Sequence, residues 1–254
     1  MITGRIHSIE TLGLLDGPGI RTIFFLQGCP LRCKYCHNPD SQNPFMGKDY
    51  SVEELTKTAL RYKNYYKKSG GGVTISGGEA LLQGNFTSEL ARSLKDEDVH
   101  VTLDTSGYGS EKYFSKVLDN VDLVLLDVKQ FENASHKDIT GKSINGLIKF
   151  IEYLKKSGVK IWARHVMLPG YSDNNKSMND LVKLLNPVIN QVEKIEILPY
   201  HKLGVEKYSQ LGIMYELESI LEMDKKEANK FEVYANERLI EEKNYKARKM
   251  DIVI

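Results

Sequence analysis

Short hydrophobic runs alternate along the chain with longer stretches in which apolar and polar residues are mixed. Six of these runs, rich in Val, Ile, Leu or Phe, predict strands at residues 20–27, 72–76, 99–104, 122–128, 160–167 and 194–199. Continuous apolar runs of this length are typical of strands buried on both faces, as in a parallel sheet covered by helices. The pattern therefore predicts an α/β chain.

The segments between these strands predict helices. The clearest begins after Ser51, because Glu54 follows three residues later in the arrangement of a capping box. Other helices are predicted near residues 111–119, 145–157 and 176–187. Six strand–helix units with right-handed crossovers curl a sheet into a barrel but fall short of the eight that close one. We therefore expect a partial, open (β/α)6 barrel of the TIM type, with its site at the carboxyl ends of the strands.

We expect residues 1–222 to form a single domain. Residues 223–254 are rich in charge and are expected to form a helix or strand and a tail packed on it. With a net charge of +1, the chain shows no bias toward nucleic acid or a membrane surface as a partner. Its apolar runs fall far short of the ~20 residues that a membrane span requires, and its first residues do not have the pattern of an export signal. We expect a cytoplasmic monomer.

All three cysteines of the chain, Cys29, Cys33 and Cys36, fall within eight residues, directly after the first predicted strand. Such a cluster is more typical of metal binding or catalysis than of disulfides. Three thiolates suit zinc or an iron–sulfur centre. His37 could complete a zinc site, or a [4Fe–4S] cluster could keep one iron open for a substrate. A redox pair formed by Cys33 and Cys36 is a third interpretation.

Polar residues follow nearly every predicted strand. Because the carboxyl ends of parallel strands meet at one rim, these side chains are expected to converge on one pocket. Two of them, Asp104 and Asp127, are carboxylates, and neighbouring carboxylates need a cation or a proton between them. The glycines of the segment 76–79 would let the backbone approach a ligand. The polar residues in question are Glu79, Asp104, Asp127, Lys129, Arg164 and His201.

The spacing Cys-x3-Cys-x2-Cys, with an aromatic residue before the last cysteine, resembles that of the radical S-adenosylmethionine (SAM) superfamily. Within it, the chain is most similar to the activating enzymes of glycyl radical enzymes, and among these to the activators of pyruvate formate-lyase, over about residues 3–215. Residues beyond 215 match this pattern poorly. The absence of further cysteines implies a single cluster and no ferredoxin-like insert. The matching motifs lie at 4–8, 16–21, 33–38, 69–73, 76–79, 126–130 and 198–201.

The resemblance implies roles for individual residues. Cys29, Cys33 and Cys36 would hold one [4Fe–4S] cluster, and its open iron would bind SAM. Asp16 would grip the target glycine, and Lys129 would balance charge and orient the reactants. Contacts to SAM would come from Tyr35, His37, Gly77, Gly78, Glu79, Asp104, Asp127, Val128, Lys129, Arg164, Val166 and His201. A monovalent cation, Na⁺ or K⁺, would be bound by Asp104, Thr105, the carbonyl of Leu125 and Asp127.

The implied reaction is reductive cleavage of SAM to a 5′-deoxyadenosyl radical, which takes a hydrogen atom from a backbone glycine of pyruvate formate-lyase. Flavodoxin or ferredoxin would supply the electron. Three alternatives stay open: an activator of anaerobic ribonucleotide reductase, another radical SAM enzyme, and a non-catalytic protein that binds zinc or an iron–sulfur cluster. The length of the chain and its Leu-Pro-Tyr-His segment favour the pyruvate formate-lyase activator over the reductase activator.

Overall fold

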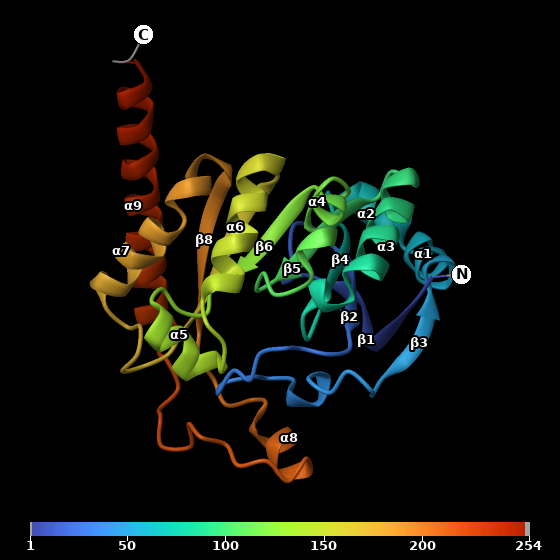
Figure 1. The fold of residues 1–254 in the computed structure, drawn as a ribbon, viewed down its shortest axis with the longest axis horizontal. Helices are drawn as coiled ribbons and strands as arrows, with labels where there is room; N and C mark the ends of the chain where they lie inside the picture. Colours follow the sequence, from blue (N-terminus) through green and yellow to red (C-terminus); the bar gives the residue numbers. More distant parts are fainter. Residues whose placement is uncertain (1, 252–254) are drawn as a thin grey trace.

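The computed structural model describes residues 2–251, which form one eight-stranded sheet in the order β3-β1-β2-β4-β5-β6-β7-β8. Six of these eight strands run parallel to one another, and each of the six coincides closely with a predicted strand. The order leaves β3 and β8 at two separate edges, so the curved sheet is an open barrel, as predicted (Figure 1). The six strands are β2 (Arg21–Leu26), β4 (Gly72–Gly77), β5 (His100–Thr105), β6 (Leu123–Asp127), β7 (Lys160–Met167) and β8 (Val192–Pro199).

Two strands that the sequence pattern did not predict extend the sheet beyond β2. β1 (Thr3–Gly13) pairs antiparallel with β2 on one side and with β3 (Lys48–Ser51) on the other. Among the apolar side chains of β1, only that of Ile6 is buried, and β3 contains only polar residues and a half-buried Tyr50. Both strands therefore lack the apolar run on which the prediction relied.

Helices connect the parallel strands and cover the convex face of the sheet (Figure 1). The capping box before α1 is confirmed: the amide of Glu54 donates to Ser51 Oγ (3.2 Å), and the amide of Ser51 donates to Glu54 Oε2 (2.8 Å). The predicted helices are α1 (Val52–Leu60), α4 (Phe114–Leu118), α6 (Asn145–Ser157) and α7 (Asn175–Leu184). Those not predicted are α2 (Lys63–Ser69), α3 (Gly84–Asp96), α5 (Asn133–Thr140) and α8 (Val205–Gln210). Short 3₁₀ turns are η1 (Pro39–Ser41), η2 (Ala80–Gln83), η3 (Glu111–Tyr113) and η4 (Asn186–Gln191).

The two faces of the parallel strands differ in chemistry, since successive side chains point to opposite sides. Apolar side chains such as Ile75, Leu103 and Leu126 pack with the helices in the largest core cluster. The alternate positions on β4 and β5 carry polar residues, among them Thr74 and Asp104. The core between sheet and helices thus supports a concave face that is free to hold polar groups.

Helix α9 (Lys225–Asp251) lies along β8 at one edge of the sheet (Figure 1). Asn236 binds both backbone groups of Ile195 (3.0 and 2.8 Å), and Glu232 accepts from the amide of Ile197 (2.8 Å). The helix therefore satisfies the backbone groups that an edge strand leaves unpaired. Among residues 2–251, no helix is long and apolar enough to cross a membrane. The division into a domain of 1–222 and a packed tail stays a prediction.

Candidate active site

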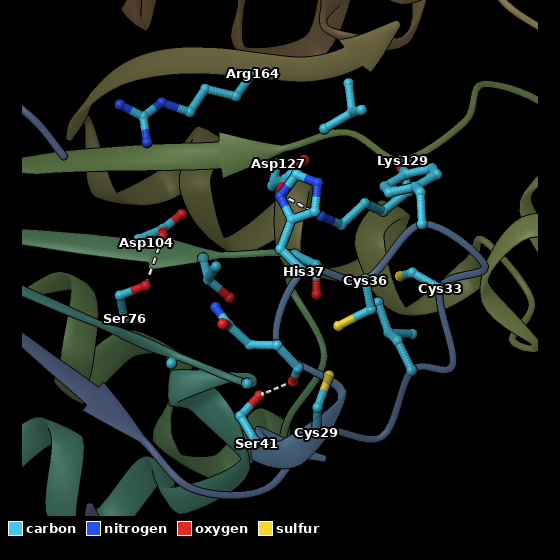
Figure 2. A pocket seen from close by; sticks show the side chains of 18 of the residues that line it. Cys29, Cys33, Cys36, His37, Ser41, Ser76, Asp104, Asp127, Lys129 and Arg164 are labelled. Carbon is cyan, nitrogen blue, oxygen red and sulfur yellow. Dashed lines mark hydrogen bonds and ion pairs between the residues drawn. The ribbon is translucent and has the colours of Figure 1, made fainter. Parts of the chain in front are cut away.

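The loop that carries the three cysteines follows β2 and is held by backbone hydrogen bonds on two sides. The amide of Cys29 donates to the carbonyl of Gln42 (3.2 Å), while the amides of Arg32 and Lys34 donate to carbonyls at the end of α5 (2.8 and 2.9 Å). All three thiols are free and half-buried, and they turn into the same space at one side of a cavity of about 270 Å³ (Figure 2). Buried thiols favour the protonated form, and burial raises the pKa of Cys33 to about 12.

Gly77 and Gly78, at the end of β4, lie close to the end of β2 and to the start of the cysteine loop, respectively. A Cβ atom on Gly77 would lie 2.2 Å from the amide nitrogen of Leu26, and its φ of +133° is unfavourable for other residues. A Cβ atom on Gly78 would lie 2.5 Å from the carbonyl oxygen of Gly28 and 3.0 Å from Cys29 Cβ. Both glycines line the cavity. A side chain at position 77 would collide with the backbone of β2, and one at position 78 would collide with the cysteine loop.

The two predicted carboxylates both reach the cavity from neighbouring strands (Figure 2). Ser76 Oγ donates to Asp104 Oδ2 (2.6 Å), and burial raises the pKa of Asp104 to about 6 even though Arg164 opposes this shift. Lys129 Nζ donates to Asp127 Oδ2, whereas Asp127 Oδ1 is buried and has no hydrogen-bond partner among the described residues. Burial lowers the pKa of Lys129, but Asp127 and other nearby groups outweigh it, so the pKa lies well above its ordinary value.

Tyr35 and His37 line the cavity next to the cysteines, and His201 packs against His37. The rings of His37 and His201 stack with centroids 4.1 Å apart, and His37 Nε2 donates to the carbonyl of His201 (3.1 Å). Lys129 Nζ lies 5.8 Å from the centre of the Tyr35 ring. The hydroxyl of Tyr35 and Nδ1 of His201 are buried without a hydrogen-bond partner in the described part of the chain. Such orphaned groups are costly unless a ligand or water binds them.

Arg164 enters the cavity from β7 and binds acceptors outside it. Its Nε donates to Glu196 Oε2 (2.8 Å), its Nη2 donates to the carbonyl of Leu15 (2.6 Å), and its Nη1 lies 4.0 Å from Asp16 Oδ1. Burial raises the pKa of Asp16, and the opposing charge of Arg164 limits this rise. Asp16 thus lies beside the cavity wall, next to a residue that lines it.

Besides Asp16, four predicted residues are not among those that line the cavity. Glu79 is buried, and it accepts hydrogen bonds from Thr105 Oγ1 (2.5 Å), from the amide and hydroxyl of Ser106 (2.8 and 2.5 Å) and from the amide of Leu81 (3.0 Å). The other three are Leu125, Val128 and His201. The carboxylate of Glu79 therefore links the loops after β4 and β5. Direct ligand contacts by these residues stay predictions.

The cavity brings together most of the predicted site residues. They are Cys29, Cys33, Tyr35, Cys36, His37, Gly77, Gly78, Asp104, Thr105, Asp127, Lys129, Arg164 and Val166. Further lining residues had not been predicted: Phe25, Leu31, Asn38, Ser41, Ser76, Ser106 and Leu198. Asn38, Ser76 and Leu198 stand within motifs noted in the sequence, and this position could have identified them as site residues. The hydrophobic Phe25 and Leu31 gave no such signal.

The donor set fits an iron–sulfur cluster with a polar ligand beside it. Within residues 2–251, no group of three or more His, Cys, Asp and Glu side chains is arranged around a single metal ion. Three thiols of one loop can instead hold a larger cluster by three of its irons. The unpartnered Asp127 oxygen and Tyr35 hydroxyl offer an acceptor and a donor to a polar ligand in the same cavity.

The chain is similar to known proteins both in one domain and over nearly its whole length. The family model of the radical SAM superfamily matches residues 23–184. A pyruvate formate-lyase-activating enzyme of Clostridium pasteurianum is 47% identical over 94% of this chain and 100% of that protein. One of Staphylococcus aureus (strain USA300) is 44% identical over 87% of this chain and 90% of that protein. The first alignment covers 94% of this chain and therefore extends beyond residue 215, whereas the poor match of the C-terminal residues to the motifs stays a prediction.

Solved structures agree on the fold. A radical SAM methyltransferase from Sphaerobacter thermophilus gives a TM-score of 0.61 at 15% identity, over 86% of this chain and 64% of that chain. Streptococcus suis SuiB bound to the precursor peptide SuiA gives 0.59 at 17% identity, over 77% and 42%. The radical SAM domain and the full-length relatives together establish the family: the chain belongs to the pyruvate formate-lyase-activating enzymes of the radical SAM superfamily.

Proposed function

We propose that the cavity at the carboxyl ends of the strands is the place where this enzyme activates pyruvate formate-lyase. The observation that carries the proposal is the meeting of three free cysteines, two carboxylates and two cationic side chains in one cavity. When bound, a reduced [4Fe–4S] cluster would give one electron to SAM, and this chemistry would supply methionine and a 5′-deoxyadenosyl radical for removing a hydrogen atom from a backbone glycine of the protein substrate. The protein's part is to bind, orient and shield the reactants.

The cysteines Cys29, Cys33 and Cys36 would bind the cluster as thiolates. Asp127, with one oxygen held by Lys129, keeps its second oxygen for a hydroxyl or ammonium donor of SAM. Tyr35 and His37 would form an aromatic wall beside it. Because these groups are fixed by contacts with one another, the reactants would meet a site that needs little rearrangement.

A monovalent cation is proposed next to this site. Asp104 lies in register with Leu125 on the adjacent strand, and both Asp104 and Thr105 line the cavity together with Asp127. A cation among these oxygens would offset the burial that raises the pKa of Asp104 to about 6. Sodium or potassium, with flexible oxygen coordination, suits such a set.

The electron is proposed to come from flavodoxin or ferredoxin, and the enzyme is proposed to act as a monomer in the cytoplasm. The three free cysteines support a reducing compartment, because oxidation would consume the thiols that the cluster requires.

The test is cleavage of SAM. The protein is reconstituted anaerobically with iron and sulfide, reduced with dithionite and given SAM, and 5′-deoxyadenosine is measured. We expect a brown protein with about four irons that forms 5′-deoxyadenosine. Cys33→Ala should lose both iron and product while its circular dichroism stays unchanged, because the loop lies outside the sheet. A colourless protein that binds one zinc ion, or a loaded and reduced protein without product, would refute the proposal.

A further inference from the structure

Glu196 lies outside the cavity but directly beside one of its residues. The register of β7 and β8 places Glu196 opposite Arg164. Its Oε2 accepts from Arg164 Nε (2.8 Å), and its Oε1 accepts from Lys194 Nζ (2.6 Å). Burial alone would raise the pKa of Glu196, yet the bonds from Lys194 and Arg164 lower it overall. Glu196 is therefore a charged anchor with both oxygens occupied.

This anchor fixes the direction in which the Arg164 guanidinium points. A guanidinium is a rigid planar fork, so binding one of its nitrogens sets the position of the others. With Nε on Glu196, Nη2 reaches the carbonyl of Leu15 (2.6 Å) and Nη1 faces Asp16 (4.0 Å). Arg164 is only 8% exposed, so solvent competes little for these contacts.

The segment that Arg164 reaches is the loop between β1 and β2. Further along the loop, Thr74 Oγ1 donates to the carbonyl of Asp16 (2.6 Å), and the buried Arg21 donates to the carbonyl of Pro18 (2.9 Å). The side chains of Leu14 and Leu15 are 68% and 84% exposed. The bond from Arg164 to the Leu15 carbonyl thus ties the more exposed part of this loop to β7, beside the cavity.

We propose that Glu196 is a positioning residue, which acts through Arg164 to hold the segment 14–16 beside the cavity, where a protein substrate enters. The inference rests on the proposed function, since a protein chain must reach this cavity. Without the charge of Glu196, Arg164 is free to turn toward Asp16 or Asp104, whose negative charges already attract it. The carbonyl of Leu15 then loses its donor, and the segment loosens.

The experiment compares Glu196→Gln with Glu193→Gln. Glu193 is a matched control because it stands on the same strand and also accepts two side-chain bonds, from Lys160 (2.7 Å) and Trp162 (2.9 Å), neither of them from Arg164. Hydrogen–deuterium exchange of the peptide 12–20, without substrate, should be about tenfold faster in Glu196→Gln and unchanged in Glu193→Gln.

The kinetic readout is the split between KM and kcat for glycyl radical formation on pyruvate formate-lyase. For Glu196→Gln we expect KM for the protein substrate to rise about tenfold, a loss of about 1.4 kcal/mol in binding, with kcat within about twofold. Formation of 5′-deoxyadenosine in the absence of the partner is measured as well, because it separates an effect on the segment 14–16 from an effect on the SAM contact predicted for Arg164. Glu193→Gln should leave all three quantities unchanged.

Unchanged exchange and an unchanged KM in Glu196→Gln would overturn the inference. So would an equal loss in every measurement together with a lower melting temperature, because that pattern indicates a general structural role. If the wild type itself forms no glycyl radical, the proposed function fails, whereas the exchange of the peptide 12–20 still decides whether Glu196 holds the segment.

Discussion

Single glycines determine how closely the cysteine loop can approach the sheet. A Cβ atom on Gly78 would lie too close to the carbonyl of Gly28 and to the Cβ of Cys29, so any side chain at position 78 must displace a backbone that carries a proposed cluster ligand. Gly212, by contrast, has nothing within 4 Å of an added Cβ atom, although its φ of +66° is itself unfavourable for other residues.

We expect Gly78→Ala to lower the iron content of the reconstituted protein to less than about half that of the wild type, because the loop must shift by more than a few tenths of an ångström. Iron and sulfide analysis measures this. Gly212→Ala, which carries backbone strain away from the site, should keep the full iron content. Equal iron in both variants would contradict the role assigned to Gly78.

A buried histidine makes stability depend on pH. His165 Nδ1 donates to the carbonyl of Val128 (2.8 Å), and its Nε2 accepts from Ser172 Oγ (2.8 Å), so the folded protein holds it uncharged. Burial lowers the pKa of His165 from 6.5 to about 4. Between these values the unfolded chain binds a proton that the folded protein does not bind. The contribution of the uncharged His165 to the free energy of unfolding is therefore fully present above pH 6.5 and is lost as the pH falls toward 4.

Denaturant unfolding from pH 7 to pH 4 tests this dependence. Between pH 7 and pH 4, we expect the free energy of unfolding of the wild type to fall by on the order of 2–3 kcal/mol more than that of His165→Gln. The comparison concerns the slope, since His165→Gln also alters the bonds to Val128 and Ser172. Parallel curves for the two proteins would show that His165 does not titrate in this way.

The sequence located residues of the site by motif, but it could not show which atom each residue uses. Glu79 stands in a motif of the site, yet its carboxylate accepts four hydrogen bonds from other residues of the protein. Glu196 stands between two apolar residues of a strand, and only the register of β7 and β8 reveals that it faces Arg164. Hydrogen-bond partners depend on packing between distant segments, which a single sequence does not contain.

At the level of elements, the long helix α9 protects the free edge of β8. We expect Asn236→Ala to destabilise the protein by about 1–3 kcal/mol, because it leaves the amide and carbonyl of Ile195 without their partner. Chemical denaturation measures the difference. The neighbouring exposed Glu237→Ala should stay within about 0.5 kcal/mol of the wild type. An unchanged free energy of unfolding in Asn236→Ala would mean that water can replace Asn236 as the partner of the Ile195 amide and carbonyl.

The predicted elements were those with a strong local pattern. The six parallel strands are rich in Val, Ile, Leu or Phe, and α1 carries a capping box, so each could be located from neighbouring residues. Helix α3 has Phe86, Leu90 and Leu94 at helical spacing, but it begins at Gly84, a poor helix former that conceals its start. Strand β1 takes its shape from pairing with β2 on one side and β3 on the other, which no local pattern encodes.

In the whole molecule, the scaffold and the site use different faces of the same strands. The convex face packs with the helices into the core, while the concave face and the loops at the carboxyl ends form the cavity. This separation is why the open barrel could be predicted from hydrophobic runs and the site from polar residues at their ends. The closeness of the cysteine loop to β4 and the coverage of β8 by α9 are long-range contacts that only the structure shows.

The most direct test of this account is electron paramagnetic resonance of pyruvate formate-lyase after incubation with the loaded, reduced protein and SAM. We expect a glycyl radical on pyruvate formate-lyase that requires SAM and disappears with Cys33→Ala. If SAM is cleaved but the radical forms only on anaerobic ribonucleotide reductase, or on neither protein, the assignment of pyruvate formate-lyase as the substrate is wrong.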